Sequence, residues 1–327
     1  MMKQNKGLIV KLVCAMSLLL VLCIGCGNRE AEVTLTPEQL RLQKIANIDS
    51  TSLKAILPLD SIEGYDRLAE ISAEAWMLID DSTGLVISQK NATRQLCMAS
   101  ITKMMTCLLA LEKGNLADTL DITEDVYVAR DSRVKVGDSF RLDDLINEMM
   151  LISDNDAAYA IAKHIGNGDT LTFCDMMNQK AMYLGMDSTH FANPNGVPNI
   201  HNYSCASDLV RLSRYAMCDS VFAQIVGTVE KDIPLTDGRH MPCRNTNALL
   251  STYEGCIGIK TGFTRQAGNC LASAATRDGV TLYLVLLNSR SMSSRFKESA
   301  LLLDYGFHVM NAWCNPQCYG QHECRML

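Results

Sequence analysis

The sequence predicts an α/β domain in which a mostly antiparallel sheet is flanked by helices and interrupted by a helical insertion. Two strand-like runs and a helical run open the domain, and a mostly helical stretch follows from 115 to 215. Three more strand-like runs and a last helix close it, so we expect distant segments to complete one sheet. About 240 residues remain once both ends are set aside, which is enough to bury a substantial core.

The opening strands are predicted at Ala75–Asp80 and Leu85–Ser88, because apolar residues dominate both runs. Asp81-Ser82-Thr83-Gly84 lies between them and has the composition of a hairpin turn. The closing elements, three strands and an amphipathic helix, are predicted at 258–262, 270–275, 281–288 and about 294–311.

A helix is predicted to begin at Ser100, because apolar residues then recur with a helical period until Gly114 supplies a stop. Lys103 follows three positions later on the same face, close enough for its amine to reach the hydroxyl. A serine becomes nucleophilic when a neighbouring base takes its proton, and a lysine with a depressed pKa can be that base. Free backbone N–H groups at the helix start would stabilise an oxyanion.

This Ser-x-x-Lys pattern is weak evidence alone, since serine is a common helix cap and a second copy occurs at Ser294 and Lys297. Two other triplets support the first copy. Ser153-Asp154-Asn155 precedes a helical run, and Lys260-Thr261-Gly262 ends a strand-like run. In this order, the three motifs are those of penicillin-binding proteins and class A β-lactamases.

From Ala73 to Asn311 the sequence resembles the low-molecular-mass D-alanyl-D-alanine carboxypeptidases, a family of serine peptidases that bind penicillin. The family's usual proline before Ala99 is Met98 here. The resemblance implies a β-lactamase/transpeptidase-like fold with an inserted all-helical subdomain, and a catalytic domain at 71–312. It rests on four segments, namely 99–106, 191–196 with Tyr203, Ser204, Asp208 and Leu209, 258–264 with Ala267, Gly268 and Leu271, and a closing segment with Arg290, Arg295, Glu298, Ser299, Gly306 and Phe307.

The resemblance and side-chain chemistry together imply a role for each motif residue. Ser100 is the nucleophile, Lys103 the general base, and Ser153 relays the proton to the departing amine. Lys260, as a second cation, should help to lower the pKa of Lys103. Asp154 is interpreted as structural.

The remaining motif residues are expected to bind the substrate. The N–H groups of Ser100 and Phe263 would hold the oxyanion, and Thr261 and Arg295 the terminal carboxylate. Asn155 would orient Lys103 and bind a substrate amide. The full expected set of substrate-binding residues is Asn155, Lys260, Thr261, Gly262, Phe263 and Arg295.

The expected activity is removal of the terminal D-Ala from peptidoglycan stem pentapeptides, with β-lactams as covalent inhibitors. Class A β-lactamases activate the deacylating water with a glutamate downstream of Ser-x-Asn, but no glutamate occurs from Met149 to Val229. We therefore expect slow release of penicillin. Two alternatives remain: a DD-endopeptidase that cuts peptide cross-links, and a non-catalytic wall-binding lipoprotein, which the intact motifs disfavour.

The N-terminus has the plan of a secretory signal. Lys3, Lys6 and Lys11 are followed by an apolar run from Leu12 to Ile24. At about 13 residues the run is short for a membrane-spanning helix, which needs roughly 20. We expect a signal peptide at 1–25.

The run ends at Gly25-Cys26 and resembles the lipobox of bacterial lipoproteins, in which Cys26 would become the lipid-bearing first residue. Cys23 stands where leucine is commoner, so a soluble secreted product and an uncleaved anchor remain alternatives. The chain ends soon after the domain, so no C-terminal anchor is expected. We expect an exported protein of the cell envelope, attached to the membrane by this lipid and facing the periplasm or cell exterior.

Residues 26–70 are predicted to form a tether with one short helix at Pro37–Ile48.

The composition of the chain also bears on the partners that we expect. A net charge of −6 and 6% aromatic residues provide no basic patch, so no nucleic-acid partner is expected. No cofactor is expected either.

Fourteen cysteines occur without a regular framework, and those such as Cys107, Cys174 and Cys270 are interpreted as buried small apolar residues. The Cys-rich tail at 313–327 has side chains suited to zinc, but in an unfamiliar spacing, so the prediction is no metal. These side chains are Cys314, Cys318, His322 and Cys324.

Overall fold

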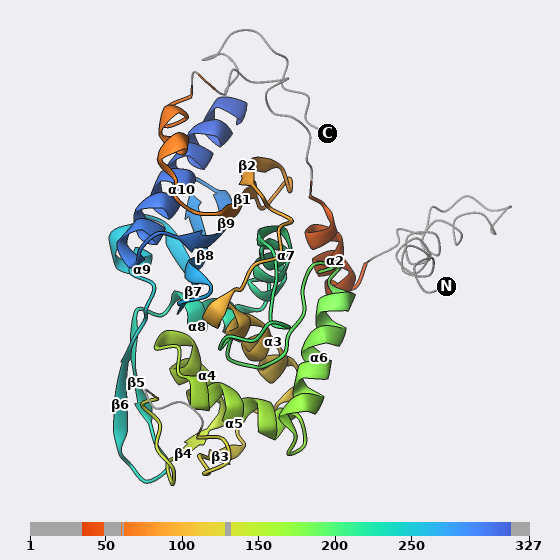
Figure 1. Cartoon of the computed structure of the whole chain (residues 1–327), viewed down its shortest axis with the longest axis vertical. Coiled ribbons are helices and arrows are strands. Elements are labelled where there is room, and N and C mark those ends of the chain that lie inside the picture. The colour runs from red at the N-terminus through yellow and green to blue at the C-terminus, as the bar shows by residue number, and fades with distance from the viewer. Residues whose placement is uncertain (1–34, 49–59, 61, 128–131, 315–327) are drawn as a thin grey trace, which may run out of the picture. The chain divides into compact units, whose positions relative to one another are not determined.

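The structure is a computed structural model that describes residues 35–48, 60, 62–127 and 132–314. The chain divides into two compact units, Met1–Glu38 and Gln39–Leu327, and the sheet, the surrounding helices and the candidate site belong to the second (Figure 1). The predicted signal peptide, Cys26 and the tail beyond Cys314 lie outside the described residues. Within the described ranges, no helix has the length and apolar character needed to cross a membrane.

A five-stranded antiparallel sheet forms the centre of the domain, with strand order β2-β1-β9-β8-β7. Because β1 pairs with β9, the sheet joins segments from the two ends of the domain, as predicted. The closing strands extend beyond the predicted runs, since their polar ends continue the ladder. The strands are β1 (Ala75–Asp80), β2 (Val86–Lys90), β7 (Cys256–Thr264), β8 (Gly268–Arg277) and β9 (Val280–Ser289).

The turn between β1 and β2 is stabilised by the Asp80 side chain. Its carboxylate accepts hydrogen bonds from the Ser82 hydroxyl at 2.6 Å and from the Thr83 backbone N–H at 2.8 Å. Gly84 follows with a φ of +73°, which glycine adopts without strain. The predicted hairpin is confirmed.

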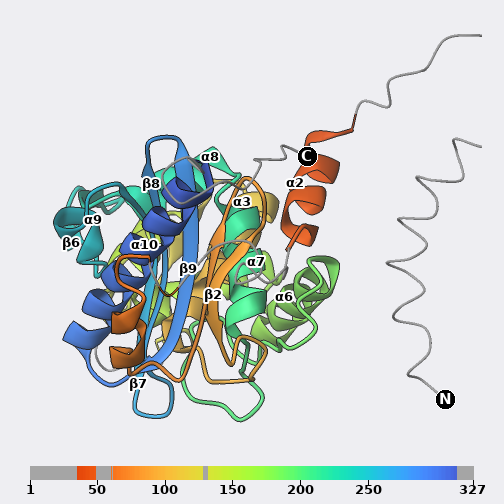
Figure 2. The same cartoon turned by 90° about the horizontal axis from the view of Figure 1, so that it is seen from above.

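Helices cover both faces of the sheet (Figure 2). α10 (Met292–Cys314) packs on one face against β9 and β8. α7 (Ala206–Ala216) and α8 (Ser220–Gly227) cover the other, and α3 (Lys103–Lys113) packs against both. The predicted closing helix is confirmed and is longer at both ends.

The side chains of β1 alternate between the two faces of the sheet, so this one strand contributes to the apolar core on both sides. Trp76 and Leu78 belong to the apolar cluster that includes α10. Met77 and Ile79 belong to the larger cluster formed with the helices of the other face. All four are buried, because successive strand side chains point to opposite faces and both faces are covered.

The region inserted between β2 and β7 contains mainly helices, as predicted, together with two small antiparallel sheets. The four short strands were missed, because runs of three to five mostly polar residues carry little apolar periodicity. Besides α3, α7 and α8, its helices are α4 (Leu142–Leu151), α5 (Asn155–Ile165), α6 (Thr170–Tyr183) and the short α9 (Leu249–Thr252). The strands are β3 (Thr119–Asp121) paired with β4 (Ser139–Arg141), and β5 (Glu230–Pro234) paired with β6 (His240–Arg244).

Part of the predicted tether packs on the domain. The expected helix is α2 (Pro37–Ala46), and a 3₁₀ helix, η3 (Asp66–Glu70), precedes β1. Ile45 of α2 is buried, and its carbonyl accepts a hydrogen bond from the Arg211 guanidinium at 3.0 Å. The C-terminal end of α2 is therefore fixed to α7.

The cysteine interpretation agrees with the structure. Cys107, Cys174 and Cys270 are buried in the apolar cluster, and the cysteines whose side chains are described are free thiols. Within the same residues, no three side chains of the metal-binding types gather into a site.

Candidate active site

The helix that carries the first motif starts with a 3₁₀ turn, η4 (Ala99–Thr102), and continues as α3 from Lys103. The sequence predicted one helix from Ser100, so the position is right and the geometry of the first turn differs. Ala99 has a φ of +49°, an uncommon value for a residue with a Cβ. Such backbone strain is concentrated at functional sites, where surrounding contacts maintain it.

Lys103 is fully buried, and its amine contacts three oxygen atoms. Nζ lies 3.0 Å from the Ser100 hydroxyl, 2.8 Å from Asn155 Oδ1 and 2.8 Å from the backbone carbonyl of Asn195. The first two contacts join the first and second motifs as predicted. The third comes from a loop whose contribution the sequence did not reveal.

The second motif lies where α4 ends and α5 begins. Asp154 is the N-cap of α5, and its carboxylate accepts from the N–H groups of Asp156 at 2.9 Å and Ala157 at 3.2 Å. It also accepts from the Ser132 hydroxyl at 2.7 Å and the Arg133 N–H at 2.6 Å. These contacts agree with a structural role for Asp154.

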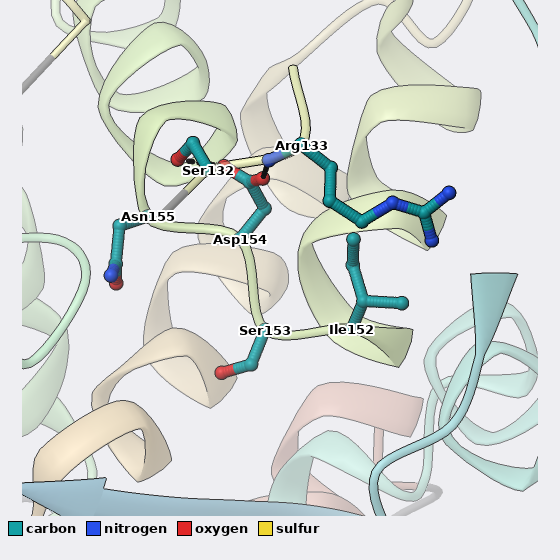
Figure 3. Close-up of a pocket in the computed structure, with 6 residues that line it drawn as sticks. All are labelled: Ser132, Arg133, Ile152, Ser153, Asp154 and Asn155. Atoms are coloured by element: carbon teal, nitrogen blue, oxygen red, sulfur yellow. Dashed lines mark hydrogen bonds between the residues drawn. The ribbon is translucent and has the colours of Figure 1, made fainter. Parts of the chain in front are cut away.

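Ser153 adopts a φ of +69°, in the left-handed region. Its hydroxyl has no hydrogen-bond partner among the described residues and is partly exposed. Figure 3 shows the Ser153 hydroxyl and the Asn155 amide on one side of the loop and the Arg133 guanidinium on the other. The loop therefore presents Ser153 and Asn155 together.

The same loop lines a cavity of about 170 Å³ (Figure 3). Ser132 and Arg133 contribute to it beside the predicted motif, although the sequence did not single them out. The lining residues are Ser132, Arg133, Ile152, Ser153, Asp154 and Asn155.

The third motif lies on β7, an edge strand of the sheet. Lys260 and Thr261 are buried, and the Thr261 hydroxyl lies 2.7 Å from that of Thr246. The Thr246 backbone N–H donates to the Leu151 carbonyl at 2.9 Å. Through Thr246, β7 is connected to the end of α4 just before Ser153.

Two glycines pack against the nucleophile segment. A Cβ on Gly262 would lie 3.0 Å from the Ser100 nitrogen, and a Cβ on Gly196 would lie 1.9 Å from the Ala99 carbonyl oxygen. Gly196 also has a φ of +86°, so both space and conformation require glycine. This packing brings β7 and the Asn195 loop against Ser100.

Positive charge is concentrated around β7. Burial, followed by the charges of Lys103 and Arg295, holds the pKa of Lys260 well below its ordinary value. Arg295 is buried and donates to the Gly262 carbonyl at 3.1 Å, while its Nε has no partner in the described part of the chain. Burial also lowers the pKa of Arg295. An arrangement of this kind favours an anionic ligand.

All three motifs therefore meet at one site. Phe263 follows Gly262 on β7, with its side chain exposed at 55%. Lys297 of the second Ser-x-x-Lys pattern is exposed on α10. Sequence reasoning missed Asn195, which was part of a recognised segment, and Thr246, whose only signal was its place between two asparagines.

Comparisons with known proteins agree with this geometry. The sequence profile described as D-alanyl-D-alanine carboxypeptidase matches residues 63–291. A D-alanyl-D-alanine carboxypeptidase of Streptomyces sp. (strain K15) is 34% identical over 255 residues, covering 72% of this chain and 88% of the relative. A D-alanyl-D-alanine endopeptidase of Pseudomonas aeruginosa is 31% identical over 255 residues, covering 76% and 79%.

Solved structures resemble the domain as well. The Streptomyces K15 DD-transpeptidase superposes with a TM-score of 0.69 at 33% identity, covering 72% of this chain and 97% of that one. A D-alanyl-D-alanine carboxypeptidase from Francisella tularensis superposes with a TM-score of 0.66 at 30% identity, covering 72% and 70%. The fold, the three motifs and these matches agree, and the chain belongs to the D-alanyl-D-alanine carboxypeptidase family of serine peptidases.

Proposed function

We propose that this protein hydrolyses the terminal D-Ala-D-Ala bond of peptidoglycan stem pentapeptides through an acyl-enzyme on Ser100. The observation that carries the proposal is the position of the Lys103 amine, 3.0 Å from the Ser100 hydroxyl and 2.8 Å from two carbonyl-type oxygens. A neutral amine has two hydrogens and one lone pair. If both hydrogens are donated to Asn155 and Asn195, the lone pair faces Ser100 and can accept its proton.

In the acylation step, the proton that Ser100 loses is returned to the leaving group. Ser100 Oγ attacks the carbonyl carbon of the penultimate D-Ala, and its proton passes to Lys103. The backbone N–H groups of Ser100 and Phe263 stabilise the oxyanion. The Ser153 hydroxyl passes a proton to the departing D-Ala nitrogen and is reprotonated from Lys103, so the amine is neutral again for deacylation by water.

The leaving D-Ala carries a carboxylate, which matches the positive surroundings of β7. Lys260, Thr261 and Arg295 are proposed to bind it, and the negative charge of the carboxylate would in turn favour the protonated form of Lys260. Asn155 binds the substrate amide, and Gly262 lets the peptide backbone approach Ser100. A β-lactam would enter as an analogue of this dipeptide and remain as a slowly hydrolysed ester.

Release of D-Ala from a synthetic pentapeptide, measured by mass spectrometry, tests the activity. The wild-type protein should release one equivalent of D-Ala per peptide, and Ser100→Ala should release none above background. Release by both proteins at the same rate would contradict the proposal.

A DD-endopeptidase is the second candidate, because the relative from Pseudomonas aeruginosa bears that name. The same residues would serve it, with a peptide amine as the leaving group. Digestion of purified cross-linked muropeptides separates the two activities: monomers appear only if cross-links are cut.

We also propose that the protein is exported and held at the membrane by a lipid on Cys26. The support is the charged N-terminus, the apolar run and its end at Gly25-Cys26. The enzyme would then act in the cell envelope, where stem peptides occur.

A further inference from the structure

Glu148 of α4 is a buried acid that the catalytic steps do not use. Its side chain is fully buried, and neither carboxyl oxygen has a hydrogen-bond partner at standard geometry among the described residues. It lies in the last turn of α4, and its carbonyl accepts from the Ile152 N–H at 3.2 Å. Glu148 is therefore built into the helix end that leads directly to Ser153.

The groups that face Glu148 come from four segments. Asp154 lies on the Ser153–Asn155 loop and Arg133 on the segment before β4, while Lys103 lies on α3 and Cys243 on β6. Burial, then the Asp154 charge, holds the pKa of Glu148 well above its ordinary value, and Arg133, together with Lys103 whenever its amine is protonated, opposes this only in part. Burial, then Glu148 itself, raises the pKa of Cys243 to about 12, so this thiol supplies no charge at neutral pH.

The Asp154 carboxylate is held in place by hydrogen bonds from both sides of the loop. It accepts from five donors, the hydroxyl of Ser132 and the N–H groups of Arg133, Val134, Asp156 and Ala157. A second negative charge at Glu148 would repel this carboxylate in an interior that screens charge poorly. Ser153, with its backbone in the left-handed region, is the direct chain neighbour of this anchored residue.

We propose that Glu148 is a positioning residue, which supports the Ser153–Asn155 loop by keeping an uncharged carboxyl group against Asp154. When Glu148 ionises, the loop shifts, and both the Ser153 hydroxyl and the Asn155 contact to Lys103 are displaced. The inference rests on the proposed function, since it assigns this loop to catalysis. The inference predicts that activity falls at alkaline pH and that this fall disappears when Glu148 is replaced by an uncharged residue.

The sign of the effect on stability follows from proton linkage. Native Glu148 keeps a proton that the unfolded chain has lost above about pH 4.3, so stability falls as pH rises from there toward the raised pKa. Glu148→Gln has no such proton. The stability of the variant relative to the wild type should therefore rise steadily over this range.

The test compares acylation by a fluorescent penicillin from about pH 6 to about pH 10 in the wild type and Glu148→Gln. The rate constants should agree at the acidic end, and one pH unit above the Glu148 midpoint the variant should react about tenfold faster. Glu112→Gln is the matched control, because Glu112 pairs with Lys180 at 2.7 Å at the far end of α3. It should follow the wild type at every pH.

Glu148→Met provides a second uncharged variant of similar volume, should the amide prevent folding. It too should lack the alkaline loss. A ratio of variant to wild-type rates that stays constant with pH, or a similar change in Glu112→Gln, would overturn the inference. If the wild type takes no penicillin at any pH, the proposed function fails together with this inference, which rests on it; if the wild type reacts and the ratio stays constant with pH, only the inference fails.

Discussion

The proposed mechanism depends on a single amine, that of Lys103, in a fully buried position. Lys103 is surrounded by oxygen atoms of Ser100, Asn155 and Asn195. An ammonium would donate to all three, whereas a neutral amine donates to two and accepts from the serine. The base role therefore requires a group that can lose its proton inside the protein.

Replacing Lys103 by arginine removes that ability, because a guanidinium stays protonated. We predict that Lys103→Arg slows acylation by penicillin roughly 100-fold to 10,000-fold, the range of general-base contributions. Stopped-flow fluorescence gives the rate constant. Lys297→Arg, in the exposed second Ser-x-x-Lys pattern, should acylate at the wild-type rate, and near-normal acylation in Lys103→Arg would rule out the base role.

At this scale the sequence identified the motif residues but not their neighbours. Ser100, Lys103 and Asn155 meet as expected, and they could be predicted because short sequence motifs identify them. Asn195 contributes a backbone carbonyl, which every residue possesses, so only the fold reveals it. Glu148 had a detectable signal, an acid among the apolar residues of α4, whose meaning depended on Asp154 lying nearby.

The elements hold the site by capping and close packing. α5 begins at the Ser153–Asn155 loop, and its N-cap Asp154 ties this loop to Ser132 and Arg133. α6 has a comparable N-cap, Asp169, which accepts from the N–H groups of Leu171 and Thr172. Only the first cap is attached to the site.

This pair of caps allows a matched experiment. Asp154→Ala should lower the free energy of unfolding by about 1 kcal/mol or more, as loss of an N-cap does. It should also slow acylation, because Ser153 and Asn155 lose their support. Asp169→Ala should destabilise the fold without changing the acylation rate, and denaturant unfolding with fluorescent-penicillin kinetics separates the two effects. Equal kinetics in both variants would mean that the cap does not position the loop.

Element prediction from the sequence succeeded where apolar periodicity was strong. The strands of the central sheet, α3 and α10 were all anticipated. The β5–β6 hairpin was not, because runs such as Glu230–Pro234 are mostly polar and half exposed. The 3₁₀ form of η4 was also missed, since it depends on Gly196 and Gly262 packing against the chain at Ala99 and Ser100.

At the scale of the whole molecule, the proposed function requires that the site reach its substrate in the cell envelope. The acidic chain, with a net charge of −6, gains no attraction from anionic lipids. A covalent lipid at Cys26 would supply attachment instead, since each buried CH₂ contributes about 0.8 kcal/mol.

Cys26→Ala should therefore accumulate as an unprocessed precursor, while Cys23→Ala, changed within the same apolar run, should be processed and lipidated normally. Mass spectrometry of the mature N-terminus distinguishes these products. A wild-type N-terminus downstream of Cys26 without lipid would refute the anchor.

The most direct test of the proposed mechanism is to locate the penicillin adduct. The wild-type protein is incubated with penicillin, quenched with acid, digested and analysed by tandem mass spectrometry. We predict one adduct per chain, as an ester on Ser100, and none in Ser100→Ala. An adduct on Ser153 or Ser294, or an intact adduct in Ser100→Ala, would contradict the assignment of Ser100 as the nucleophile.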